Sequence, residues 1–283
     1  MESVKDINIV FVNYFMKDEI LHAVASVRND IAGCPYEVQI TVSDNSQNQD
    51  GIKEALAAQF PMVRYIDCRE NVGFGKGNTV GFMAAPARYY FALNPDIIIP
   101  ENSRAIERVV RFMDEHPRVG GIGLKLLNTD GTLQYSCYRF DLLSMFIKPF
   151  KQIHLDEKYK WIRKFSDRLL MKDFDHNTTR PVDWVLGAAM VARQEALDQV
   201  GWFDERYFMY FEDADFCLRA KGAGFTVGTA KCVVKHNIEE HRFGKNKLKK
   251  QYLINSNKQF IKTWVPMYFW PIAYTYLTFL RFR

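Results

Sequence analysis

The sequence lacks any CxxC pair of cysteines, and its five cysteines are an odd number. A disulfide framework and a cysteine zinc site are therefore not expected, and a reducing compartment is favoured. The first residues, MESVKDINIVFVNYF, contain no basic segment followed by a long apolar core, so no signal peptide is predicted. We expect the catalytic part of the chain to stay in the cytoplasm.

Acidic residues are absent from positions 241–283, which contain nine Lys or Arg residues. All 33 acidic residues therefore lie before this tail, together with 29 of the 38 basic ones. A slightly acidic body is thus followed by a strongly basic extension. With 48% hydrophobic and 25% charged residues, the composition is that of a folded globular protein and argues against disorder.

The tail has a basic part, RFGKNKLKK, and an aromatic part, WVPMYFWPIAYTYLTFL, at 264–280. As a helix the second part would span about 26 Å, short of the roughly 30 Å hydrocarbon core, and Pro266 and Pro271 would disturb it. Aromatic residues beside basic ones favour the surface of an anionic membrane. We expect a peripheral contact at the inner face of the cytoplasmic membrane; the alternative is a core or dimerisation helix. No recognised module accompanies the basic part to indicate nucleic-acid binding.

Strand and helix signals alternate over the first 125 residues. Strands are predicted at 7–12, 37–42, 63–66 and 89–93, and helices at 18–30, 52–59, 76–85 and 103–115. This rhythm predicts an α/β fold with a Rossmann-like, mostly parallel sheet flanked by helices. A helix at 158–171, a strand at 182–193, a helix at 213–220 and a strand at 233–236 follow.

No repeat or low-complexity linker divides the chain. We therefore predict one catalytic domain over residues 1–240, with an insertion at 133–183 on the acceptor side of the active site. Residues 241–283 are predicted to form a helical, membrane-associating extension.

Polar residues follow the predicted strands, where ligands bind in such sheets. These residues are Asn13, Tyr14, Asp44, the segment 71–78 and Asp96. Asp44 either accepts a hydrogen bond from a pyrimidine base or forms an Asx turn. Asp96, in Asn-Pro-Asp, either holds Mg²⁺ or Mn²⁺ or belongs to a turn. The glycine-rich turn at 73–78 either presents backbone N–H groups to a phosphate or makes a tight strand-to-helix connection.

Three carboxylates, Glu212, Asp213 and Asp215, follow the aromatic run at 207–211. An apolar setting raises the pKa of a carboxylate toward the range useful for a general base. One of these acids is expected to cap a helix, and Asp215 can form a surface pair with Arg219. His236 ends the apolar strand and is either structural or a second metal contact.

The chain carries, in order, ENVGFGKGN, LNPD, WVLGAAMVAR and VGWFDERYFMYFEDADFCLRAKG. With these motifs, residues 6–237 resemble the inverting glycosyltransferases of family 2, which have the GT-A fold. The resemblance is strongest to the bacterial rhamnosyltransferase-like branch that builds cell-surface polysaccharide. The last motif is the most specific of the four.

The resemblance implies roles for the matching residues. Asp213 would be the general base, and Asp96, with His236, would bind Mg²⁺ or Mn²⁺ at the donor diphosphate. Asn94 replaces the first aspartate of the usual acidic motif, so this motif offers a metal ion one carboxylate instead of two. The acceptor side would include Trp184, Gly187 and Glu212. The donor side would include Asn13, Tyr14, Asp44, Asn71, Gly73, Phe74, Asn78, Asn94 and Asp96.

The implied reaction moves a sugar to a polyprenyl-diphosphate-linked saccharide during O-antigen-like polysaccharide (lipopolysaccharide) synthesis. dTDP-rhamnose is the leading donor, with UDP-hexoses and GDP-mannose as further candidates. A nucleotidyltransferase is one alternative, but INIVFVNYF lacks its glycine-rich signature. An inactive sugar-nucleotide-binding or scaffold module is another, and Asp96, Asp213 and Asp215 argue against it.

Overall fold

The computed structural model describes residues 3–140, 160–169, 171–172, 174–236, 247–271 and 273–274. The strands are β1 Lys5–Asn13, β2 Val38–Asp44, β3 Arg64–Asp67, β4 Ala87–Leu93, β5 Ile97–Ile98, β6 Val119–Leu127, β7 Leu133–Gln134, β8 Cys137–Tyr138, β9 Arg180–Pro181, β10 Trp184–Val185, β11 Ala189–Arg193 and β12 Thr226–His236. The helices are α1 Lys17–Asp30, α2 Ile52–Gln59, α3 Phe74–Met83, α4 Ala105–Glu115, α7 Lys160–Leu169, α8 Gln194–Val200, α9 Glu212–Gly222, α10 Lys247–Trp264 and the short 3₁₀ helix η1 Met267–Phe269.

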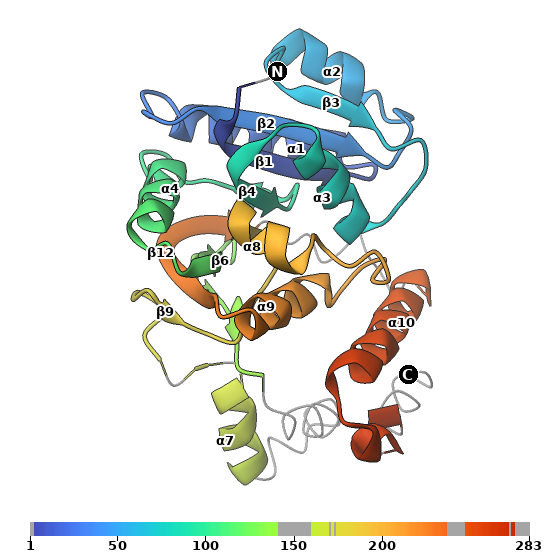
Figure 1. The fold of residues 1–283 in the computed structure, drawn as a ribbon. Helices are drawn as coiled ribbons and strands as arrows, with labels where there is room; N and C mark the ends of the chain where they lie inside the picture. Colours follow the sequence, from blue (N-terminus) through green and yellow to red (C-terminus); the bar gives the residue numbers. More distant parts are fainter. Residues whose placement is uncertain are drawn as a thin grey trace.

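Ten of the described strands form one sheet: eight follow the path β3-β2-β1-β4-β11-β6-β12-β5, and off this path β7 pairs with β6 and β9 with β12 (Figure 1). β1 to β4 run parallel, and β12 is parallel to β6. β11 is antiparallel to both of its neighbours, β4 and β6. The predicted α/β architecture is therefore confirmed, and the sheet is mixed: the five-residue β11 lies antiparallel within it, and the short strands β5, β7 and β9 also pair antiparallel.

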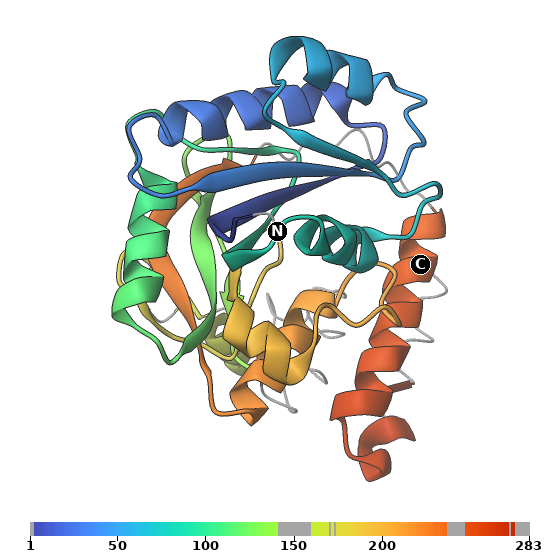
Figure 2. The same cartoon turned by 45° about the horizontal axis from the view of Figure 1, so that its top comes forward.

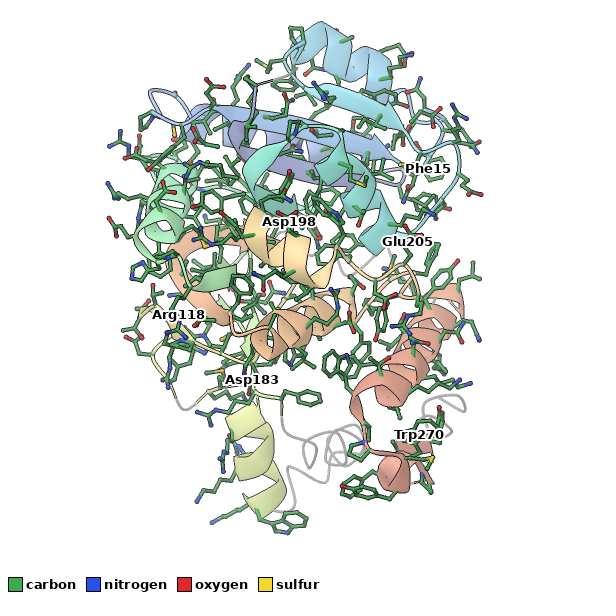
Figure 3. The ribbon with its side chains drawn as sticks, in the orientation of Figure 1. Phe15, Arg118, Asp183, Asp198, Glu205 and Trp270 are labelled. Atoms are coloured by element: carbon green, nitrogen blue, oxygen red, sulfur yellow. The ribbon has the colours of Figure 1, made fainter. Side chains whose placement is uncertain are left out.

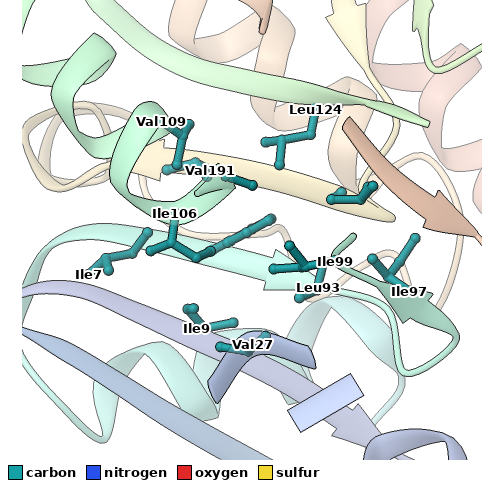
Figure 4. Packing of buried hydrophobic residues seen from close by; sticks show 14 of the residues in the cluster. Ile7, Ile9, Val27, Leu93, Ile97, Ile99, Ile106, Val109, Leu124 and Val191 are labelled. Atoms are coloured by element: carbon teal, nitrogen blue, oxygen red, sulfur yellow. The ribbon is translucent and has the colours of Figure 1, made fainter. Parts of the chain in front are cut away.

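Helices cover both faces of this sheet. Since neighbouring residues of a strand point to opposite sides, each face of the sheet packs in its own core cluster. On one face Ile9 belongs to the core cluster that contains Val27 of α1 and Ile106 of α4 (Figure 4). On the other face Val10 packs in a cluster with Phe82 of α3. Figure 2 shows α1 and α2 on one side of the parallel strands and α3 on the other. Burial on both faces explains why β1 reads as a continuous apolar run.

The predicted insertion at 133–183 contains β7, β8, α7 and β9, and β8 pairs with β10 in a separate two-stranded sheet. The helix expected at 158–171 is confirmed as α7. Positions 141–159 of the insertion lie outside the described residues.

The described part of the extension begins with α10, which lies beside the loop between α8 and α9 in both views (Figures 1 and 2). Ser256 Oγ donates a 2.7 Å hydrogen bond to the carbonyl of Met209, and Trp264 Nε1 donates a 2.8 Å bond to Asp215 Oδ1. Among the described residues, no helix is long and apolar enough to cross a membrane. Residues 237–246 and 275–283 of the predicted tail lie outside the described part.

Several elements differ from their predicted forms. The predicted helix 52–59 coincides with α2, but the helix expected at 76–85 begins at Phe74. β6 and α8 were not predicted. β6 contains Gly123, where a Cβ atom would lie 2.6 Å from Val185 Cβ. Glycines that admit a neighbouring side chain weaken the apolar pattern of a strand, so this pattern is poorly visible in the sequence.

The close packing of α3 on the sheet generates the first prediction. A Cβ atom on Gly81 would lie 2.4 Å from Val10 Cγ1, whereas one on Gly222, also helical, would meet nothing within 4 Å. Gly81→Ala should lower the free energy of unfolding by about 1–3 kcal/mol through overpacking. Gly222→Ala should change it by less than about 1 kcal/mol. Chemical denaturation measures both, and equal stabilities would contradict this packing.

Candidate active site

A cavity of about 440 Å³ opens beyond the carboxyl ends of β1 and β4. Its wall is made by segments from the parallel half of the sheet, the loop after β10, the start of α9 and the N-terminal part of α10. The structure brings most of the predicted site residues together there. The predicted residues in the wall are Tyr14, Asn71, Gly73, Phe74, Asn94, Asp96, Trp184, Gly187, Glu212 and Asp213.

Asp44 is fully buried and does not belong to the cavity wall. Its Oδ1 accepts hydrogen bonds from Asn13 Nδ2 (2.9 Å) and from the backbone (2.8 Å) and hydroxyl (2.6 Å) of Ser46. Its Oδ2 accepts bonds from Asn48 N (2.6 Å) and Tyr65 Oη (2.8 Å). Burial raises the pKa of Asp44, but these bonds outweigh it and hold the pKa below its usual value. The Asx-turn interpretation fits this network, and the contact of Asp44 with a base stays a prediction.

Asn13, like Asp44, is held by hydrogen bonds within the protein. Its Nδ2 also donates to Asp50 Oδ2 at 3.0 Å, and its Oδ1 accepts a 3.0 Å bond from the Met16 backbone. Asn78 is buried on α3, where its Nδ2 donates to the Phe74 carbonyl at 3.0 Å. Asn13 and Asn78 therefore support the cavity from behind its wall, so a direct donor contact by either stays a prediction.

The glycine turn is held by contacts within the protein. Gly73 has φ 86°, and a Cβ atom there would lie 2.2 Å from the Phe208 carbonyl oxygen. The Phe74 N–H donates to this carbonyl at 2.8 Å, and the Gly73 N–H donates to Asn71 Oδ1 at 3.1 Å. Lys76 pairs at 3.0 Å with Glu205 on the loop between α8 and α9 (Figure 3). These two N–H groups and Lys76 thus bind protein atoms, as the tight-connection interpretation predicts.

Two left-handed residues direct the predicted base into the cavity. Tyr210 and Phe211 have φ 73° and 72°, which is costly for large side chains and is found mainly at functional sites. α9 starts directly after them, and Asp213 Oδ2 accepts a 2.7 Å hydrogen bond from the Gly187 backbone. Asp213 Oδ1 accepts a 2.7 Å bond from Ala214 N. The expected acidic N-cap is wrong, because Phe211 occupies that position without a side-chain hydrogen bond.

Asp215 is only 1% exposed, so the expected surface pair with Arg219 is a buried one. Arg219 Nε lies 2.7 Å from Asp215 Oδ2, and the Trp264 indole binds Oδ1. The sequence spacing of the pair was correct, but α10 covers it. Asp215 therefore joins α9 to α10 and does not line the cavity.

Glu212 is the carboxyl group with the most altered environment in the site. It is 4% exposed, and its Oε2 has no hydrogen-bond partner among the described residues. Burial, with the adjacent Asp213 carboxylate, raises the pKa of Glu212 well above its usual value. Glu212 therefore retains its proton to higher pH than an ordinary glutamate, which leaves Asp213 as the candidate proton acceptor.

A divalent ion would find one carboxylate in the cavity wall beside Asn94, namely Asp96. The backbone of His236 pairs with Ile97, directly after Asp96, while the His236 side chain lies outside the described part. In the described chain no group of three His, Cys, Asp or Glu residues forms a metal cluster. Mg²⁺ commonly takes one or two carboxylates and completes its shell with waters and substrate phosphates. Asp96 with Asn94 fits such a substrate-completed ion.

Trp184 stacks on Tyr138 with ring centroids 4.1 Å apart and forms part of the wall near Asp213. Sequence reasoning missed two wall residues on α10, Lys249 and Leu253. They are four positions apart, which is one helical turn, but the basic composition around them pointed to a membrane surface. Their place at the cavity depends on how α10 packs.

Two family models match the chain. The one described as Glycosyl transferase family 2 matches residues 6–176, and the one described as Glycosyl transferase family group 2 matches residues 157–282.

Three curated relatives are similar in sequence. An N-acetylglucosaminyl-diphospho-decaprenol L-rhamnosyltransferase of Mycobacterium tuberculosis is 28% identical over 66% of this chain and 62% of its own length. The rhamnosyltransferase WbbL of Escherichia coli is 30% identical over 54% and 55%, respectively. The low-salt glycan biosynthesis hexosyltransferase Agl10 of Haloferax volcanii is 24% identical over 84% and 70%. The match to the mycobacterial relative thus spans less than two thirds of that protein.

Two solved structures share the fold. GalNAc-T7 with UDP, GalNAc and Mn²⁺ has a TM-score of 0.63 at 13% identity, covering 95% of this chain and 49% of that one. The mannosyltransferase PcManGT of Pyrobaculum calidifontis, with GDP-Man and Mn²⁺, has a TM-score of 0.60 at 14% identity, covering 97% and 70%. These likenesses show the GT-A fold that the sequence predicts.

The raised pKa of Glu212 generates the second prediction. Because the folded protein binds this proton more tightly than the unfolded chain, the folded state loses stability as pH rises above the ordinary value of 4.5 toward the raised pKa. Glu212→Gln carries no such proton. Its stability relative to the wild type should rise across this window by up to about 1.4 kcal/mol per pH unit. Denaturation at several pH values measures the difference, and a constant difference would contradict the assignment.

Proposed function

Because the chain belongs to glycosyltransferase family 2, we propose that it transfers a sugar from a nucleotide donor to a lipid-linked saccharide. The observation that carries the proposal is the position of Asp213, held by the Gly187 backbone in a cavity that also contains Asp96. The rhamnosyltransferase relatives favour L-rhamnose, donated by dTDP-rhamnose, as the transferred sugar. The decaprenol diphosphate named for one relative favours a polyprenyl-diphosphate acceptor in cell-surface polysaccharide synthesis.

Asp213 is the proposed general base. Its carboxylate takes the proton of an acceptor hydroxyl as that oxygen attacks the anomeric carbon of the donor. The bond from this carbon to the diphosphate oxygen breaks, and its electron pair leaves with the nucleoside diphosphate. Attack opposite the leaving group inverts the configuration. The Gly187 N–H and Ala214 N–H orient the carboxylate for this step.

The donor diphosphate is proposed to lie near Asp96 and Asn94, with Tyr14, Asn71, Gly73 and Phe74 in the adjoining wall. Asp96 and Asn94 would hold Mg²⁺ or Mn²⁺, with His236 as a further proposed ligand. When bound, the ion supplies positive charge for the departing diphosphate. The Mn²⁺ in both structures of similar fold supports a divalent cation.

The acceptor sugar is proposed to lie against Trp184 and Gly187, on the side of Asp213 away from the donor. Trp184 provides an aromatic face for the sugar ring, since it is already supported by stacking on Tyr138. Glu212, which holds its proton to higher pH, can donate a hydrogen bond to an acceptor hydroxyl.

The third prediction tests the reaction and its base. Release of nucleoside diphosphate should depend on a lipid-diphosphate sugar acceptor and should occur with one of the dTDP-, UDP- or GDP-sugars. Asp213→Asn should lose about 10²–10⁴-fold in kcat or more, because general-base assistance contributes this much, while donor binding persists. Asp198→Asn, at an exposed position of α8, is the matched control and should retain wild-type kcat.

Near wild-type turnover by Asp213→Asn would rule out the base assignment. Release that persists in EDTA would contradict the proposed metal binding by Asp96 and His236, but it would still support transferase activity. Donor binding without release from any donor would favour an inactive sugar-nucleotide-binding module.

A peripheral contact with the inner face of the cytoplasmic membrane is also proposed for the extension. α10 itself contributes buried residues such as Phe260 and Ile261, whereas Met267 and Tyr268 of η1 are 74% and 75% exposed. These two side chains, together with Leu248 of α10, which is 62% exposed, are the exposed large apolar side chains in the described part of the extension, and such side chains can enter a membrane surface.

The fourth prediction concerns this contact. The double substitution Met267→Ser and Tyr268→Ser should weaken co-sedimentation with anionic vesicles by about tenfold or more, because each apolar side chain contributes roughly 1.5–3 kcal/mol on burial. Met83→Ser, which changes a 69% exposed methionine at the end of α3, is the control and should bind as the wild type does. Equal binding of the double variant would place the contact elsewhere.

A further inference from the structure

Lys249 is the only basic residue among the described residues that line the cavity. It lies on the first turn of α10, one helical turn before Leu253, which also lines the cavity. On the opposite strand ends, Asn94 and Asp96 face the same space. The basic tail therefore contributes a cation to the site, in addition to any contact it makes with a membrane.

The position of Lys249 is set by packing along the whole of α10. Tyr252, three residues later, stacks on Phe208 with ring centroids 4.3 Å apart. Phe260 packs against Phe211 at 4.9 Å, and Trp264 binds Asp215. These contacts attach α10 to the loop before α9 and to α9 itself, so they hold Lys249 over the cavity.

The charges of the cavity leave a clear need for a cation. Its wall carries the carboxyl groups of Asp96 and Asp213 beside Glu212, which retains its proton to higher pH, and a nucleoside diphosphate also enters as an anion. Lys76 of the glycine turn pairs with Glu205 outside the wall. Lys249 is half-buried and lies in the same cavity wall as Asp96.

We propose that Lys249 binds the diphosphate of the nucleotide donor and neutralises the leaving group. This inference rests on the proposed transferase function. The ammonium donates hydrogen bonds to phosphate oxygens and stays protonated, while the electron pair of the broken sugar–oxygen bond moves onto the diphosphate. No proton is exchanged in this contact. An ammonium suits the task because it is a compact charge with three donors.

The replacement of an acid by Asn94 fits this arrangement. With one carboxylate fewer beside the diphosphate, the protein offers a divalent ion one charged ligand fewer. A side-chain cation can then share the task of offsetting the charge of the diphosphate. The Gly73 and Phe74 N–H groups bind protein oxygens and are not directed to a ligand phosphate. Lys249 is then the described side chain best placed to offset the charge of the diphosphate.

The fifth prediction compares nucleotides that differ in one phosphate. Calorimetric titration of the full chain with dTDP, UDP and GDP, and with the matching monophosphates, is done in Mg²⁺ and in EDTA. Lys249→Met should weaken binding of the preferred diphosphate by about 10-fold or more, because it removes charge-assisted hydrogen bonds. Binding of the monophosphate should change less than about twofold. Lys249→Arg should restore most of the diphosphate affinity.

Lys258→Met is the matched control, because Lys258 is an exposed residue of the same helix outside the cavity wall. It should bind every nucleotide as the wild type does. Lys249→Gln replaces the methionine variant if the melting temperature of the latter falls. Unchanged diphosphate affinity in both Lys249 variants would overturn the proposal, as would an equal loss for mono- and diphosphates.

The acceptor also carries a diphosphate, so a separate arm measures KM for the lipid-linked acceptor. An unchanged nucleotide affinity with a raised acceptor KM would assign Lys249 to the acceptor diphosphate and would overturn the donor assignment. If the wild type bound none of the three nucleoside diphosphates, the proposed transferase function itself would fail, and this inference with it. The two failures are therefore distinguishable.

Discussion

The backbone hydrogen bond from Phe74 to the carbonyl of Phe208 joins two distant parts of the chain at the cavity. It requires glycine at position 73, because a Cβ atom there would overlap this carbonyl. On one side of the bond, α3 packs against the parallel strands; on the other, the loop turns through two left-handed residues into α9. The ring of Phe208 then stacks on Tyr252 of α10. The wall of the cavity depends on this junction, since three segments meet there.

Exposure to the cavity separates the structural carboxylates from those available for chemistry. Asp44 and Asp215 are buried, and both oxygens of each are occupied by donors from the protein. Buried carboxylates of this kind stabilise the fold only while their partners remain. Asp96, Glu212 and Asp213 instead face the cavity. Acidic residues in similar sequence motifs therefore have different roles, and these roles depend on the surroundings of each side chain in the fold.

α10 is the part of the extension that contributes to the active site. Its aromatic residues cover the buried pair of Asp215 and Arg219, and its first turn places Lys249 opposite Asp96. A helix with basic and aromatic residues is also suited to a membrane surface. The first turns of α10 line the cavity, whereas the proposed membrane contact involves the later part of the extension. The apolar residues Phe260 and Ile261 pack inward, while Met267 and Tyr268 remain exposed. The proposed lipid-linked acceptor would contact both the cavity and the exposed end of the extension.

The α/β order, most element boundaries in the parallel half and the residues that follow its strands can be predicted from the amino-acid sequence, because apolar periodicity and turn residues are local signals. Six of the ten predicted residues that line the cavity follow strands of the parallel half, whose ends meet at one edge of the sheet, whereas Trp184, Gly187, Glu212 and Asp213 have roles that the family resemblance implies. The antiparallel direction of β11, the burial of Asp44 and Asp215 and the place of Lys249 in the cavity wall depend instead on tertiary contacts. Burial and the identity of neighbours arise from contacts between residues far apart in the chain, which no local pattern records.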